Sequence, residues 1–241
     1  MRPSRIPAVF FLLGLLLPAL LLAAEPWKNK PYTKWTPEEV RKVMEDSPWA
    51  YRVLRIEMPP PDAGRPREDD RARGRMGDYT SAVPTYTPPP PVWRAESLLF
   101  IVQWRSSLTM RQAVVRWAEL AGRGSEEEAA RFLSTPSEEY VLVLYGPAMP
   151  ALNDLSEEAL QASAYLQAEP GMRKVSPTQV KLLREGTNLI LAEFHFSRKA
   201  AGADILGPGD SKVRFSCPTA SGAMEAKFDL RKMVRDAKPD L

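Results

Sequence analysis

Residue types that carry acid–base and nucleophilic chemistry are scarce in this chain. Its 241 residues include one histidine, His195, and one cysteine, Cys217. A serine or cysteine nucleophile activated by an imidazole would therefore have to use His195. This histidine alternates with Phe194 and Phe196, on the face of an expected strand that it shares with Glu193. The pattern favours a partly exposed histidine at the surface of a sheet over a general base.

Metal and nucleotide chemistry lack their usual sequence patterns. One histidine and one cysteine cannot form a Cys/His zinc cluster, and the HExxH motif is absent. The densest acids outside helix starts are Asp62 and 68–70, and five nearby arginines neutralise them, so a carboxylate-only calcium site has little support. No GxGxxG or Walker A loop is present to cradle a phosphate. The sequence therefore predicts no cofactor and no metal.

Paired carboxylates are the chemistry that needs no histidine. Glu138, Glu139 and Glu193 are candidates for a pair of the kind that hydrolyses glycosides, with the two acids about 5–10 Å apart. The acids at 38–39 and 126–128 fall in the first turns of expected helices, where they complement the helix dipole. A GxSxG nucleophile elbow is absent. The sequence thus leans away from an enzyme, with a carboxylate-based hydrolase as an alternative.

Four aromatic residues lie in polar or loop contexts. They are Trp27, Tyr32, Trp35 and Trp93. Together they form the best candidate for a contact patch with a partner, because aromatic side chains anchor interfaces. The alternative, which is favoured, is that the N-terminal arm packs onto the domain and buries part of this set.

The N-terminal segment has the parts of a secretory signal. Arg2 and Arg5 precede an apolar run over 6–22, and the small residues Ala23 and Ala24 follow. Cleavage after Ala24 is predicted, with cleavage one residue earlier or an uncleaved anchor as alternatives. No other apolar run approaches the ~18 residues that span a bilayer, so no membrane span is expected after cleavage. The predicted location is the periplasm or the outside of the cell.

Charge gives no sign of nucleic-acid binding. Removing the signal removes Arg2 and Arg5 and leaves 31 basic against 30 acidic residues. A nucleic-acid-binding domain would need basic residues clustered on one face. The expected partner is therefore an envelope protein or a small ligand.

The segment 59–95 differs in composition from the rest of the chain. It is rich in proline, and five arginines between 65 and 75 intermix with acids, so it buries too little apolar surface to offset its ordering entropy. It is predicted to be a disordered, locally polyproline II loop that interrupts one exported domain over 25–241.

Periodicity and capping patterns predict the ordered elements. Thr36 with Glu39, Thr109 with Gln112, and Ser125 with Glu128 have the spacing of capping boxes, and Ser156 starts a further helix. Strand patterns cover 49–58, 98–104, 140–145, 178–183, 188–197, 212–217 and 223–230. The run 140–145 is apolar on both faces, which predicts a central strand. The order indicates one α+β domain, with a largely antiparallel sheet and helices packed on one face.

Cys217 shares an alternating face with Val213 and Phe215. A buried thiol that packs as a small hydrophobe is therefore predicted. A single cysteine also means that the chain has no internal disulfide.

A set of short segments, taken in order, resembles a known family. These segments are Trp35-Thr36 through Asp46-Ser47-Pro48-Trp49-Ala50, then Val102-Gln103-Trp104-Arg105-Ser106-Ser107-Leu108, 140–150, Ala162-Ser163-Ala164-Tyr165-Leu166, Phe194-His195-Phe196, Lys212-Val213-Arg214-Phe215 and 226–234. The chain resembles uncharacterised exported proteins known mainly from acidobacteria. The resemblance implies export and a single domain, and it supplies no catalytic residue.

Taken together, these patterns favour a non-catalytic exported protein with a binding or scaffolding role in the cell envelope. One alternative is a small-ligand carrier with an apolar pocket between sheet and helices. The other is the carboxylate-based hydrolase.

Overall fold

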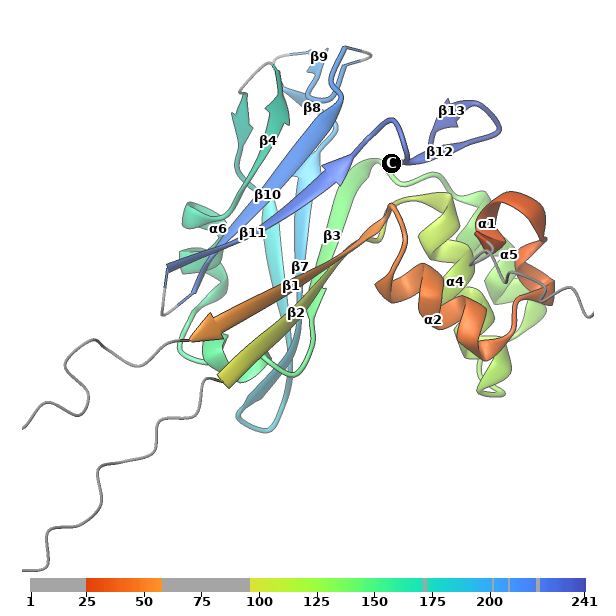
Figure 1. Ribbon diagram of the computed structural model, residues 1–241, viewed down its shortest axis with the longest axis horizontal. Helices are drawn as coiled ribbons and strands as arrows, with labels where there is room; N and C mark the ends of the chain where they lie inside the picture. Colours follow the sequence, from red (N-terminus) through yellow and green to blue (C-terminus); the bar gives the residue numbers. More distant parts are fainter. Residues whose placement is uncertain (1–24, 58–95, 171–172, 201, 208, 220–221) are drawn as a thin grey trace, which may run out of the picture.

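The computed structural model describes residues 25–57, 96–170, 173–200, 202–207, 209–219 and 222–241 (Figure 1). The predicted signal peptide (1–24), the predicted disordered loop (59–95) and Trp93 lie outside the described residues.

Five strands form the larger sheet. In spatial order they are β1 (Ala50–Glu57), β2 (Glu96–Trp104), β3 (Glu139–Tyr145), β7 (Asn188–Ser197) and β6 (Gln179–Glu185), and each neighbouring pair is antiparallel. The strand β3 lies in the centre and is largely buried, which confirms its predicted place. Its register with β7 sets Val141 opposite His195.

Four strands form a second sheet. Their spatial order is β11 (Gly222–Asp229), β10 (Lys212–Thr219), β4 (Tyr165–Glu169) and β5 (Lys174–Val175), again antiparallel. Two small hairpins, β8 (Lys199–Ala200) with β9 (Ala203–Asp204) and β12 (Val234–Arg235) with β13 (Lys238–Pro239), complete the described strands.

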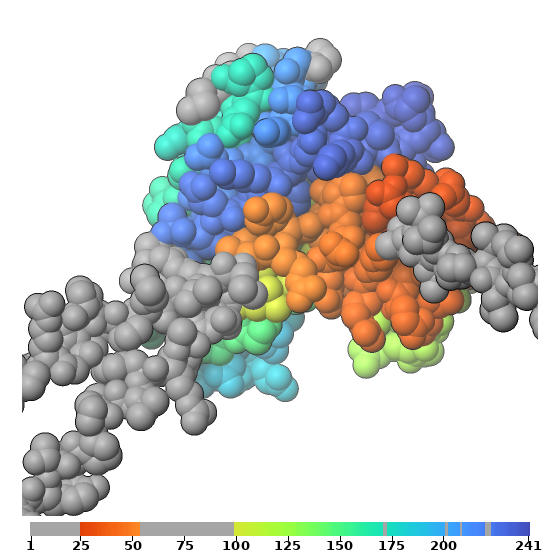
Figure 2. Space-filling view, viewed as in Figure 1, coloured from red at the N-terminus to blue at the C-terminus, as the bar shows by residue number. Residues whose placement is uncertain are grey.

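Aromatic side chains join the two sheets. The ring centroids of Phe194 on β7 and Phe215 on β10 are 5.0 Å apart, and Trp104 on β2 lies 5.4 Å from Phe228 on β11. At one edge β11 lies beside β1 (Figure 2). The α+β class with antiparallel strands is confirmed, but the predicted single sheet is wrong. The inner face that was expected to carry helices is covered by the second sheet.

The helices begin where capping residues place them. They are α1 (Pro26–Asn29), α2 (Pro37–Glu45), α4 (Leu108–Leu120), α5 (Glu126–Ser134) and α6 (Glu157–Ser163), with short 3₁₀ turns η1 (Tyr32–Lys34) and η2 (Met149–Leu152). The capping boxes of Thr36 and Ser125 are confirmed. The predicted cap at Thr109 is wrong, since Ser107 caps α4 by accepting from the Met110 N–H.

Most helices gather in one place. Figure 1 shows α1, α2, α4 and α5 together beside β1, β2 and β3, whereas α6 lies elsewhere and packs on β6 and β10. The prediction that the helices cover one sheet face is therefore wrong: four of them form a cluster at the side of the sheet pair. Its contact with the outer face of the larger sheet creates the site described below.

A tail segment ties this helical cluster to the sheets. The Asp240 carboxylate accepts hydrogen bonds from the backbone N–H groups of Leu108 (2.6 Å) and Thr109 (3.0 Å) at the start of α4. The Asp240 carbonyl accepts from the Trp49 indole N–H at 2.7 Å, just before β1. Asp240 is buried, so these contacts are shielded from water.

Cys217 is fully buried on β10 together with Val213 and Phe215, which confirms the prediction. Burial raises the pKa of its thiol to about 12. A thiol that is neither ionised nor accessible does not attack disulfides or alkylating reagents.

The native protein is therefore expected to show no reaction with a chromogenic disulfide reagent near neutral pH. One thiol should react after unfolding in urea, measured by absorbance. An Ala130→Cys variant is a matched control, because this exposed position on α5 should add one thiol that reacts in the native state. Rapid labelling of native Cys217 would contradict its burial.

Candidate functional site

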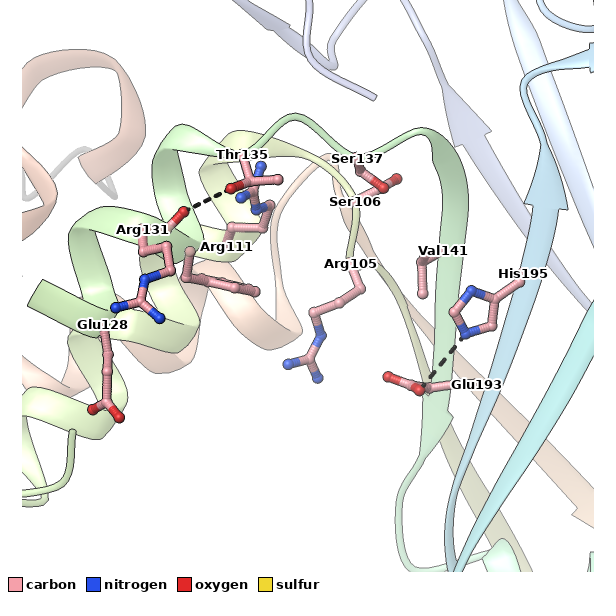
Figure 3. Close-up of a pocket in the computed structure, with 11 residues that line it drawn as sticks. Arg105, Ser106, Arg111, Glu128, Arg131, Thr135, Ser137, Val141, Glu193 and His195 are labelled. Atoms are coloured by element: carbon pink, nitrogen blue, oxygen red, sulfur yellow. Dashed lines mark hydrogen bonds and ion pairs between the residues drawn. The ribbon is translucent and has the colours of Figure 1, made fainter. Parts of the chain in front are cut away.

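A pocket of about 580 Å³ opens between the helical cluster and the outer face of the larger sheet. Figure 3 shows its two walls, with Arg111 and Arg131 on the helices and Val141 and His195 on the strands. The Arg105 side chain extends into the space between these walls. The pocket is thus assembled from segments that are far apart in sequence.

The turn from β2 into α4 supplies two of the lining residues. The pairing of β2 with β3 ends at this turn. The backbone N–H groups of Arg105 (2.7 Å) and Ser106 (3.3 Å) both donate to the Val141 carbonyl. Ser107 then caps α4 and fixes the direction of the helix. Arg105 and Ser106 therefore project at a strand-to-helix junction with little backbone freedom.

Arg105 is a half-buried charge whose side chain extends into the pocket. Burial lowers the pKa of its guanidinium, and the nearby Tyr145 and Glu193 oppose this effect. Its Nη2 donates to the Gln103 Oε1 at 2.8 Å, while its Nε is buried and has no hydrogen-bond partner among the described residues. A buried donor without a partner carries a desolvation penalty that a ligand would relieve.

The helical wall carries two more guanidinium groups. Arg111 is buried, and its guanidinium lies 4.8 Å from the centroid of the Phe132 ring. Burial lowers the pKa of Arg111, and Asp240 acts in the opposite direction. Arg131 is exposed and lies 3.6 Å from Glu127, a distance at which an exposed pair contributes little.

His195 lies between two carboxylates. Its Nδ1 is 2.9 Å from the Glu139 Oε2, and its Nε2 is 3.8 Å from the Glu193 Oε2. A carboxylate only accepts, so the contact with Glu139 places a proton on Nδ1 and leaves the Nε2 lone pair free in the neutral ring. The side chain is 14% exposed, and its Nε2 is buried without a hydrogen-bond partner among the described residues.

The pocket gathers unpartnered polar atoms. Within the described part of the chain, seven side-chain N or O atoms are buried without a hydrogen-bond partner. Three of them belong to residues that line this one pocket: Arg105 Nε, Ser106 Oγ and His195 Nε2. Buried polar groups are normally satisfied, so such a concentration indicates a place where a ligand or water supplies the missing partners.

The structure places the predicted carboxylates around the histidine. Glu139 and Glu193 both approach His195, and Glu193 lines the pocket, whereas Glu138 is exposed. The sequence had placed His195 on the outer face beside Glu193, and this is confirmed. The histidine is more enclosed than a sheet-surface residue, because the helical cluster covers that part of the face.

The predicted aromatic contact patch is divided between environments. Trp35 is buried, and its indole N–H donates to the Lys30 carbonyl at 3.1 Å. Trp27 packs edge-on against the buried Trp49, with ring centroids 5.9 Å apart, and Tyr32 packs on Trp35 at 6.5 Å. These contacts agree with the favoured alternative, in which the N-terminal arm packs onto the domain.

Sequence reasoning missed Arg105, Ser106 and Arg111 as site residues. One usable signal was the charged Arg111 beside Met110 and Ala113 on the buried side of α4. The other signal was the polar pair Arg105 and Ser106, which lies between the apolar strand over 98–104 and the helix cap Ser107. Neither signal identifies the opposite wall, which comes from residues thirty or more positions away in the chain.

Within the described ranges, no group of three or more His, Cys, Asp or Glu residues is arranged to hold a metal ion. None of the helices seen there is long and apolar enough to cross a membrane. Comparison of the chain with protein-family models, with curated proteins and with solved structures finds no match.

Proposed function

We propose that this protein is an exported binding protein that holds a small anionic ligand in the pocket between α4, α5 and the larger sheet. The observation that carries the proposal is that three residues lining this pocket each have a buried polar side-chain atom without a hydrogen-bond partner among the described residues. The Arg105 Nε and the Ser106 hydroxyl can donate to an anion. The His195 Nε2 can accept from a hydroxyl or N–H group of the same ligand.

The charge balance of the pocket favours a singly charged ligand. Arg105, Arg111 and Arg131 contribute three positive charges, and Glu128 and Glu193 contribute two negative charges. The sum of these five charges is one positive charge. A carboxylate fits this balance, and its two oxygens match the paired N–H donors of a guanidinium.

Binding of a small carboxylate is expected to depend on Arg105. Charge-assisted hydrogen bonds contribute about 1.5–3 kcal/mol, so Arg105→Met should weaken binding of propionate about tenfold or more. The measurement is an NMR titration of the ¹⁵N-labelled protein with sodium propionate. Propionamide, which has nearly the same shape and no charge, should cause much smaller shifts.

Stability separates this role from a structural one. Arg105→Met removes a half-buried charge with an unpartnered Nε, but it also removes the donor to the buried Gln103 Oε1 (2.8 Å), so its thermal midpoint should lie close to that of the wild type. Arg41→Gln on the exposed face of α2 is the control for loss of one positive charge and should bind propionate normally. Equal binding of propionate and propionamide, or unchanged binding by a folded Arg105→Met variant, would refute the proposal.

A further inference from the structure

A second cavity adjoins the pocket. It is a groove of about 240 Å³ between α4 and α5, lined mainly by apolar groups that include Val114, Val115, Ala118, Ala129 and Phe132. An apolar cavity of about 150 Å³ is enough to hold a benzene molecule. The groove therefore has room for a short hydrocarbon chain.

The groove and the pocket are adjacent, because Glu128 and Phe132 line both of them. The Phe132 side chain is 44% exposed, and the Arg111 guanidinium lies over its ring. A ligand whose anionic end reaches the pocket arginines would therefore leave the pocket across Phe132 and enter the groove.

The two helices also expose unusual apolar surface. Of the seven large hydrophobic side chains that are exposed among the described residues, three lie on α4 and α5: Trp117 (46%), Leu120 (40%) and Phe132 (44%). Of these three, Phe132 lines both the pocket and the groove, and exposed apolar surface beside a polar pocket is characteristic of a ligand-binding site.

We infer that the pocket and the groove form one site for a carboxylate that carries a short alkyl chain. The carboxylate lies among the arginines, and the chain lies between α4 and α5. This inference rests on the proposed anion site and adds the chemical class of the ligand. The single net positive charge matches one carboxylate, and the apolar groove matches a tail without hydrogen-bonding groups.

Chain length provides the test. Each buried methylene contributes about 0.8 kcal/mol, which corresponds to roughly fourfold tighter binding. Titration of the purified protein with propionate, pentanoate and heptanoate, all as free monomers, should show affinity rising by about this factor per methylene until the groove is filled. The shifted NMR signals should extend from the pocket to residues of α4 and α5.

Two tryptophan variants localise the effect. Ala129→Trp fills the groove and should abolish the gain with chain length while propionate still binds. Ala130→Trp places the same side chain one position along α5, where it is exposed, and should behave like the wild type. Ala118→Trp fills the groove from α4 and replaces Ala129→Trp if that variant has a lower thermal midpoint.

The outcomes separate the two proposals. If propionate binds through Arg105 but affinity does not rise with chain length, the alkyl groove is refuted and the anion site stands. If affinity rises equally in the Ala129→Trp and Ala130→Trp variants, the chain lies elsewhere and the groove is again refuted. If no carboxylate binds, the proposed function itself fails.

Discussion

Replacing Trp104 by alanine is expected to lower the free energy of unfolding by about 3–5 kcal/mol. Trp104 is fully buried at the end of β2. Its ring centroid lies 5.5 Å from that of Tyr140 in the same sheet and 5.4 Å from that of Phe228 in the other sheet. Alanine would leave a cavity between two sheets that cannot close without shifting both.

Urea denaturation followed by circular dichroism measures this effect. Trp117→Ala is the matched control. Trp117 on α4 is 46% exposed, so this substitution should lower the free energy of unfolding far less. The loss in free energy of unfolding for Trp104→Phe should lie between those of Trp104→Ala and Trp117→Ala. Phenylalanine keeps an aromatic ring, and the substitution removes an indole N–H that has no partner among the described residues. Equal losses for the Trp104→Ala and Trp117→Ala variants would disprove the central packing role of Trp104.

Asp240→Asn is expected to destabilise the protein by about 1.5–3 kcal/mol. The two carboxylate oxygens of Asp240 accept from the N–H groups of Leu108 and Thr109. An amide has only one oxygen, so its NH₂ group would face a backbone donor and leave one buried N–H unsatisfied. The substitution also removes a negative charge at the start of α4, where the helix dipole favours one.

The same denaturation experiment tests this prediction. Asp236→Asn is the control, because the Asp236 side chain is 92% exposed and asparagine tolerates its positive φ of 48°. Hydrogen exchange should locate the loss, with faster exchange at the first amides of α4 in the Asp240→Asn variant. A stability equal to that of Asp236→Asn would show that the tail does not hold α4.

Elements with strong local patterns were predictable from the sequence. The pattern over 188–197 gives the bounds of β7, because buried and exposed residues alternate along it. The helix starts at Thr36 and Ser125 follow from capping boxes, which depend on residues only three positions apart. Such local signals require no knowledge of distant partners.

The missed strand β4 explains the wrong sheet count. It has five residues, and its burial does not alternate, since the middle three residues are all buried. When β4 is not recognised, the sequence offers β10 only its hairpin partner β11. The simplest prediction then adds this hairpin to the larger sheet. The second sheet exists because β10 pairs with β4, a contact between segments about fifty positions apart that no local pattern encodes.

The site was less predictable than the fold for the same reason. His195 and the acids were identified as residues, but their meeting depends on the register of β3 with β7. Arg105 lines a pocket only because α4 and α5 lie beside the outer face next to it. Trp35, which the sequence placed in a polar segment, is buried by contacts with the arm and the helical cluster.

The tail contact of Asp240 also constrains when the chain can fold. Its partners at Trp49 and at Leu108 lie 191 and 132 positions earlier in the chain. Contacts of such sequence separation form late and slow the folding of a domain. During synthesis, the first turn of α4 therefore lacks its carboxylate acceptor until residue 240 has left the ribosome.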